Sequence, residues 1–102
     1  MLVENIHNAL RENTSGDQNV AVGGSCLDAN TTGNNNTAVG GNALSSNTTA
    51  SGNAAFGRGS LANNTTGAKN AGYGYESLND NTTGGNNTGV GYSALGFNTT
   101  AS

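Results

Sequence analysis

The sequence is poor in the residue types from which active sites are assembled. Its 102 residues include one histidine, one cysteine, no tryptophan and no proline, and charged residues make up only 9% of the chain. Catalytic acids, bases, nucleophiles and metal ligands come from such types. We therefore expect a protein that is not an enzyme and that has no cofactor or metal site.

The small number of charges and the absence of long apolar runs exclude further classes of partner. The formal net charge is -3, and the three basic residues, Arg11, Arg58 and Lys69, lie far apart in the sequence. No basic surface for phosphate groups is expected, and we predict no nucleic-acid partner. No apolar run approaches the roughly 18 residues of a membrane span, so we also predict no membrane insertion.

The chain is instead rich in asparagine and glycine, which recur with a period of 17 residues and without an insertion or deletion. Four columns of the repeat hold one residue type throughout. The first asparagine column contains Asn13, Asn30, Asn47, Asn64, Asn81 and Asn98. The second contains Asn19, Asn36, Asn53, Asn70 and Asn87. The leucine column contains Leu10, Leu27, Leu44, Leu61, Leu78 and Leu95, and the glycine column contains Gly23, Gly40, Gly57, Gly74 and Gly91.

A short strand precedes each of these glycines, because segments such as NTAVG at 36–40 alternate as strands do. The residue before the glycine forms a further column: Val22, Val39, Phe56, Tyr73 and Val90. A period of 17 is too short for a pair of helices, and glycine, asparagine and threonine oppose helix formation. We predict an all-β protein, a parallel β-solenoid of about five 17-residue coils over residues 13–102.

Stacked coils lie about 4.8 Å apart, so each column becomes a ladder of like side chains. We expect structural ladders from the leucine column, the Val/Phe/Tyr column and the second asparagine column, with Tyr73 pointing inward. Cys26 is expected to be a small buried residue. One leucine and one further large side chain per coil offset the entropy of ordering poorly. We therefore expect a homo-oligomer in which the leucine or the Val/Phe/Tyr column packs around a shared axis.

The two ends of the sequence carry separate expectations. Residues 1–12 place Leu2, Val3, Ile6, Ala9 and Leu10 at helical spacing, which predicts a short amphipathic helix or cap with a solvated His7. The 102 residues equal six periods of 17, so a second copy stacked on the C-terminal end continues in register. This arithmetic favours head-to-tail stacking of copies into a filament.

The unit NTAVGGNAL at 36–44, with NTGVGYSAL at 87–95, resembles the head repeat of trimeric autotransporter adhesins. It is also similar to the Asn/Thr-rich repeats of long phage tail fibres. The resemblance covers residues 13–102, although the NTTG turn makes each unit longer than the usual head repeat. It implies a left-handed, trimeric β-roll in an extracellular surface filament or a virion.

Three kinds of surface chemistry follow from the pattern. Asn-x-Ser/Thr triplets make the first asparagine column, together with Asn35, Asn63 and Asn86, candidate N-glycosylation sites on an exposed turn. Tyr75 and Tyr92 share a column with Gly24 and Gly41 and are candidate exposed aromatics for binding. Two neighbouring threonine columns offer hydroxyls for ice binding. The first holds Thr31, Thr48, Thr65, Thr82 and Thr99, and the second holds Thr32, Thr49, Thr66, Thr83 and Thr100.

Taken together, these features predict a structural fibre protein, a β-solenoid that assembles into a rod or filament and is a candidate for glycosylation. The alternative is an adhesin head module that binds host carbohydrate or matrix. An ice-binding solenoid is the third interpretation.

Overall fold

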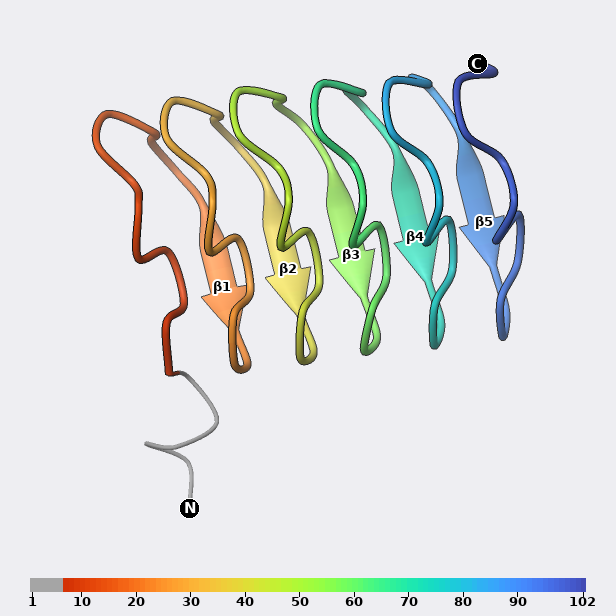
Figure 1. The fold of residues 1–102 in the computed structure, drawn as a ribbon, viewed down its shortest axis with the longest axis horizontal. Coiled ribbons are helices and arrows are strands. Elements are labelled where there is room, and N and C mark those ends of the chain that lie inside the picture. Colours follow the sequence, from red (N-terminus) through yellow and green to blue (C-terminus); the bar gives the residue numbers. More distant parts are fainter. Residues whose placement is uncertain (1–6) are drawn as a thin grey trace.

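The computed structural model describes residues 7–102 and shows an all-β solenoid, which confirms the predicted fold class (Figure 1). Each coil contributes one three-residue strand to a single parallel sheet with the order β1-β2-β3-β4-β5. The strands are β1 (Val20–Val22), β2 (Thr37–Val39), β3 (Ala54–Phe56), β4 (Ala71–Tyr73) and β5 (Thr88–Val90).

The register between coils follows the period of the sequence. Ala38 pairs with Ala55, and Val39 pairs with Phe56, so every strand residue lies beside the residue 17 positions later. The flanking backbone continues these bonds, as Gly57 N donates to Val39 O at 2.8 Å. Because each coil repeats the previous one, like residues come into contact in every column.

The helix predicted for residues 1–12 is not formed by residues 7–12, and residues 1–6 lie outside the described part of the chain. Asn8 and Leu10 have φ values of 64° and 54°, which are left-handed and incompatible with an α-helix. Leu10 N donates instead to Cys26 O at 3.0 Å, so this segment stacks on the next coil. Ala9 and Leu10 instead occupy the columns of Ala43 and Leu44, so they belong to the repeat. His7 is exposed, as expected, but lies in a turn.

The core is a narrow column of leucine and small residues inside the coils. Its fully buried members are Leu27, Leu44, Leu61, Leu78, Cys26, Ala38, Ala43 and Ala55. The leucine column is therefore buried within the chain, at least from Leu27 to Leu78. Cys26 is buried as expected, and this burial raises the pKa of its thiol.

The Val/Phe/Tyr column was predicted to point inward, and this prediction is wrong. In each of the strands β2 to β5 the middle residue is buried, while Val22 and Tyr73 are each 43% exposed and Val90 is 71% exposed. The reason is the width of the coil, because a Cβ at Gly72 in the middle of β4 would lie 2.6 Å from Ser60 Oγ. Even a methyl group is too close at Gly72, and the middle residue of β1, β2 and β3 is no larger than alanine, so the large side chains of the strand take the outer face.

Candidate functional site: side-chain ladders and a surface hollow

The first asparagine column forms a continuous ladder of amide hydrogen bonds inside the solenoid. Asn47 Nδ2 donates to Asn30 Oδ1 at 3.0 Å, and Asn64 Nδ2 donates to Asn47 Oδ1 at 3.0 Å. Each of these amides also donates to a backbone carbonyl three residues later, as Asn47 does to Ala50 O at 3.0 Å. The ladder thus links every coil to its neighbour and closes the turn within the coil.

The second asparagine column ties side chain to backbone. Asn36 Oδ1 accepts from the backbone N of Asn53 at 2.9 Å, and Asn36 Nδ2 donates to Ala50 O at 2.8 Å. No buried side-chain nitrogen or oxygen in residues 7–102 lacks a hydrogen-bond partner. Both asparagine columns are therefore satisfied polar ladders.

This arrangement corrects the expectation that the periodic glycosylation triplets present their asparagines on an exposed turn. Asn30, Asn47, Asn64 and Asn81 are fully buried. Their Nδ2 atoms, to which a glycan would be attached, donate to other asparagines and to the backbone. Asn13 and Asn98 are partly buried in the same ladder, while Asn35, Asn63 and Asn86 are exposed. An oligosaccharide can reach only these three without breaking the amide ladder.

The two threonine columns differ in whether their hydroxyls are bonded within the solenoid or exposed. Three hydroxyls of the first column, those of Thr31, Thr65 and Thr82, donate to the backbone of the next coil, each at 3.2 Å. In the second column Thr32, Thr49 and their equivalents are exposed. One free hydroxyl column remains rather than two, so nothing in the structure favours ice binding over the other interpretations.

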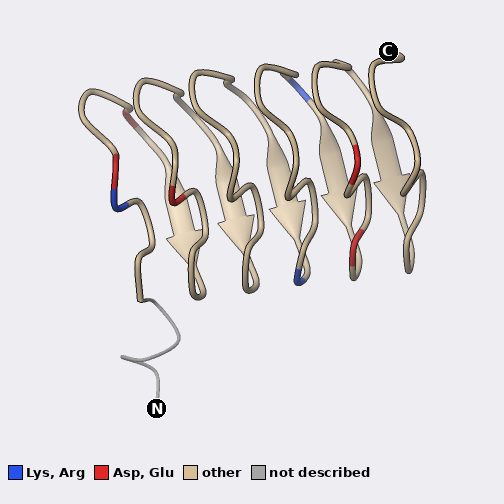
Figure 2. Cartoon of the chain, viewed as in Figure 1, with Lys and Arg blue, Asp and Glu red and all other residues tan. Residues whose placement is uncertain are grey.

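Charged groups are sparse and scattered along the described coils (Figure 2). Arg11 donates from Nε and Nη2 to the carboxylate of Asp28 at 3.0 and 3.3 Å, which joins the first two coils at the surface. Within residues 7–102, no three His, Cys, Asp or Glu side chains gather closely enough to hold a metal ion. The described coils also contain no helix that is able to span a membrane.

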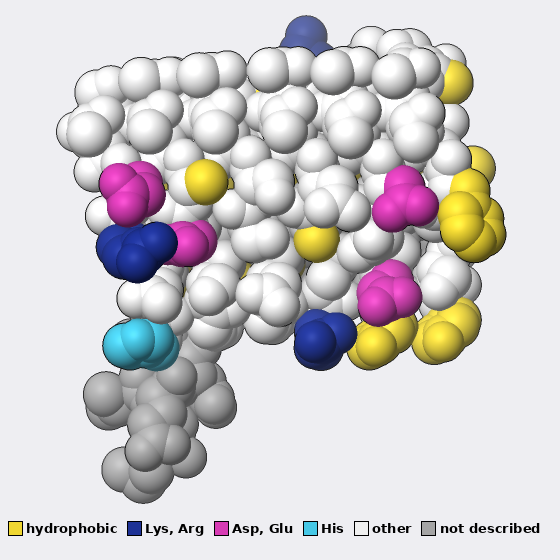
Figure 3. Space-filling model, viewed as in Figure 1, with side chains coloured by type: hydrophobic (Ala, Val, Ile, Leu, Met, Phe, Trp, Pro, Cys, Tyr) yellow, Lys and Arg dark blue, Asp and Glu magenta, His cyan; other side chains and the backbone are white. Residues whose placement is uncertain are grey.

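All five aromatic residues lie on the surface of the three C-terminal coils: Phe56, Tyr73, Tyr75, Tyr92 and Phe97. Figure 3 shows hydrophobic side chains gathered at that end of the solenoid, on a face that is otherwise mostly uncharged and polar. None of the five is buried, and Tyr75 and Tyr92 are 42% and 79% exposed, as their column predicts. Aromatic side chains are usually drawn into cores and interfaces, so this distribution marks a surface available for contact.

Four of these rings stack along the solenoid axis. Phe56 and Tyr73 have ring centroids 4.9 Å apart, and Tyr75 and Tyr92 have centroids 5.4 Å apart, with nearly parallel planes in both pairs. The guanidinium of Arg58 lies 5.9 Å from the centroid of Tyr75 and covers its other face. Tyr75 therefore presents its edge to solvent rather than its face.

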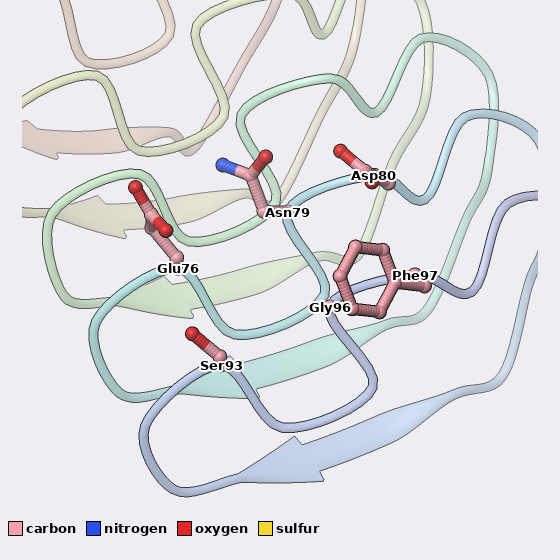
Figure 4. Close-up of a pocket in the computed structure, with 6 residues that line it drawn as sticks. All are labelled: Glu76, Asn79, Asp80, Ser93, Gly96 and Phe97. Carbon is pink, nitrogen blue, oxygen red and sulfur yellow. The ribbon is translucent and has the colours of Figure 1, made fainter.

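A shallow hollow of about 230 Å³ lies between the last two coils, and sequence reasoning did not find it. Its lining residues are Glu76, Asn79, Asp80, Ser93, Gly96 and Phe97. Glu76 and Ser93 lie on one side of it, and Asp80 and Phe97 lie on the other (Figure 4). The available signal was the departure of Gly96 and Phe97 from the residue types of their columns.

Comparison of the chain with protein-family models, with curated proteins and with solved structures gives no match.

Proposed function

We propose that the chain is a non-enzymatic structural protein, a β-solenoid that forms a rod or a segment of a fibre. The observation that carries this proposal is the set of unbroken ladders. Backbone bonds, asparagine amides and leucines repeat from the coil of Leu10 to the coil of Leu95. The columns that never vary in sequence are mainly those that hold coils together, which is what a rod requires.

The outer face of the sheet is the surface that supports lateral self-association. Two outward columns cross it: Val20, Thr37, Ala54, Ala71 and Thr88, and beside them Val22, Val39, Phe56, Tyr73 and Val90. Neither column contains a charged residue, and its β-branched and aromatic side chains suit packing against a second sheet. The leucine column is already used inside the chain, so the Val/Phe/Tyr column is the one that meets partner copies.

The resemblance to adhesin heads and tail fibres adds three finer parts to the proposal. These are a left-handed coil, a trimeric assembly, and a place in an extracellular filament or a virion. End-to-end stacking of copies lengthens the same rod, and glycans, where a host attaches them, occupy Asn35, Asn63 or Asn86.

The proposal is tested by electron microscopy and sedimentation of the purified protein and two variants. Val39→Glu places a charge on the outer sheet face, and Thr49→Glu is the matched control on an exposed turn. We expect wild type and Thr49→Glu to form elongated assemblies with a repeat of about 4.8 Å along the axis. Val39→Glu is expected to lose lateral association, so that its assemblies are no wider than one chain, with an unchanged circular dichroism spectrum. A wild-type protein that stays monomeric at every concentration contradicts the proposal.

A second function, an adhesin head that binds carbohydrate or matrix, is supported by the aromatic surface of the C-terminal coils. Replacing Tyr75 and Tyr92 together by alanine leaves the buried ladders intact. Loss of attachment to host surfaces by this variant, with rods still visible by microscopy, would favour the adhesin. Unchanged attachment would remove both tyrosines from consideration.

A further inference from the structure

The hollow between the last two coils is made by residues that depart from the repeat. Position 97 is aromatic only in the last coil, and the equivalent residues are Glu12, Ala29, Ser46, Asn63 and Asp80. Position 96 is glycine only there, and the equivalent residues are Arg11, Asp28, Ser45, Ala62 and Asn79. The hollow therefore results from two adjacent changes, one that removes a side chain and one that adds a ring.

Stacking among the coils of residues 7–102 gives no reason for either change. Phe97 is 93% exposed, so its ring adds almost nothing to the core and presents apolar surface to water. Asn98, the next residue, keeps the ladder bond to Asn81 Oδ1 at 3.1 Å, so the coil is held without help from the phenylalanine. An exposed ring beside a hollow is free to contact a ligand.

The charge of the hollow indicates which ligand. Glu76 and Asp80 contribute two carboxylates, and no lysine or arginine lines the hollow. The Glu76 carboxylate makes no hydrogen bond or ion pair with any described residue, whereas Asn79 is held by its bond from Nδ2 to Gly59 O at 2.8 Å. The guanidinium of Arg58 lies over the ring of Tyr75 and does not line the hollow. A cationic group with hydrogen-bond donors is complementary to this lining.

We propose that the hollow binds a single sugar ring that carries a protonated amine. The face of Phe97 stacks against the C–H face of the sugar and attracts the ammonium group. Glu76 and Asp80 accept hydrogen bonds from the ammonium and ring hydroxyls, and Ser93 adds a hydroxyl on the side of Glu76 (Figure 4). The volume of about 230 Å³ is below that of typical drug-sized pockets, which fits one ring rather than a buried chain. This binding site goes beyond the role of the chain as a rod.

The test is isothermal titration calorimetry of the full chain with a tetramer of glucosamine at low salt. We expect saturable binding that weakens by about tenfold or more in Phe97→Ala and in the double variant Glu76→Gln with Asp80→Asn. Glu12→Gln removes an exposed carboxylate from the far end of the solenoid and is expected to leave binding unchanged. Circular dichroism of each variant confirms that the solenoid is folded.

The fully N-acetylated tetramer separates recognition of the amine from simple stacking, and it is expected to bind at least about tenfold more weakly. Three results overturn the proposal: no binding of the glucosamine tetramer, equal binding of the acetylated tetramer, or equal weakening by Glu12→Gln. Binding that survives Phe97→Ala overturns it as well. Rod formation is scored by microscopy on the same samples, so failure of the site is distinguished from failure of the fibre.

Discussion

At the scale of single residues, buried asparagines take a share of the interior that large apolar side chains occupy in most domains. In the coil of Leu44, the asparagines at 36 and 47 are fully buried together with that leucine, Ala38 and Ala43. Burying an amide is unfavourable unless all its donors and acceptors are paired. Here each amide meets an identical amide or a backbone group in the next coil, so the repetition itself satisfies the buried polar atoms.

Asn47→Ala is predicted to destabilise the protein strongly. It leaves Asn30 Oδ1 without the bond from Asn47 Nδ2, and it removes one acceptor of Asn64 Nδ2. Ala50 O keeps its bond from Asn36 Nδ2 and loses only the one from Asn47. At about 1–3 kcal/mol for each buried group left unpaired, we expect the free energy of unfolding to fall by about 3 kcal/mol or more. Urea unfolding followed by circular dichroism measures this loss.

Asn63→Ala is the matched control, because Asn63 is exposed and makes only long contacts of 3.4 and 3.5 Å with Asn79 and Asp80. We expect its effect to stay within about 0.5 kcal/mol. Equal losses for the two variants would show that the buried ladder contributes no more than a surface amide.

The residue columns were predictable from the sequence. Whether the side chains of a column face the core or the solvent was predicted correctly only for some of them. The period identifies the leucine and asparagine ladders, and both are found. In a strand of three residues, either the middle residue or the two outer residues face the core. The large apolar side chains of Val39 and Phe56 favoured the second arrangement, which is wrong. The deciding quantity, the distance across the coil to Ser60, is not encoded in any local pattern.

At the scale of the structural element, each coil turns through backbone conformations that are rare outside glycine. In the coil of Leu44, Asn42 and Leu44 have φ values of 63° and 53°, and the preceding Gly40 has a φ of 122°. A left-handed leucine costs about 1–2 kcal/mol. The cost is tolerated because this corner places Leu44 fully in the core and brings its N–H to Ser60 O at 3.0 Å.

Gly40→Ala and Gly41→Ala are a matched pair that tests the corner. A Cβ at Gly40 would lie 2.6 Å from Gly57 C, at a φ that favours glycine, whereas a Cβ at Gly41 meets only Arg58 Cγ at 3.9 Å. We expect Gly40→Ala to lower the free energy of unfolding by at least about 2 kcal/mol and Gly41→Ala to change it by less than about 0.5 kcal/mol.

Thermal or urea unfolding of the two glycine variants is sufficient for the comparison. Similar stabilities would mean that neighbouring coils separate easily at the corner, in conflict with the tight register between β2 and β3. The corner also explains why the helix predicted near Leu10 is not formed. That prediction depended on the helical spacing of apolar residues, whereas contact with the next coil imposes a left-handed backbone at Leu10.

At the scale of the whole molecule, the core is a narrow column along the solenoid axis, and each coil contacts only its neighbours. Side-chain bonds join residues about 14 to 17 positions apart, such as Asn36 to Asn53 and Asn30 to Asn47. Stability in such an array is approximately a sum of coil and interface contributions. The 17-residue period of the sequence predicted this architecture. The hollow was not predicted, because Gly96 and Phe97 differ from the other residues of their columns and the period gives no information about them.

Deletion of residues 53–69 removes one whole coil and joins Gly52 to Asn70, so every remaining column stays in register. We expect a folded solenoid with lower stability and a smaller urea m-value, since less surface is exposed on unfolding. Deletion of 53–68 instead leaves Lys69 as an extra residue and makes one coil 18 residues long. Although this chain is longer, we expect it to be the less stable one, because the asparagine and leucine ladders must bulge or slip by one position. Equal stability of the two deletions would show that the 17-residue register is not what holds the coils together.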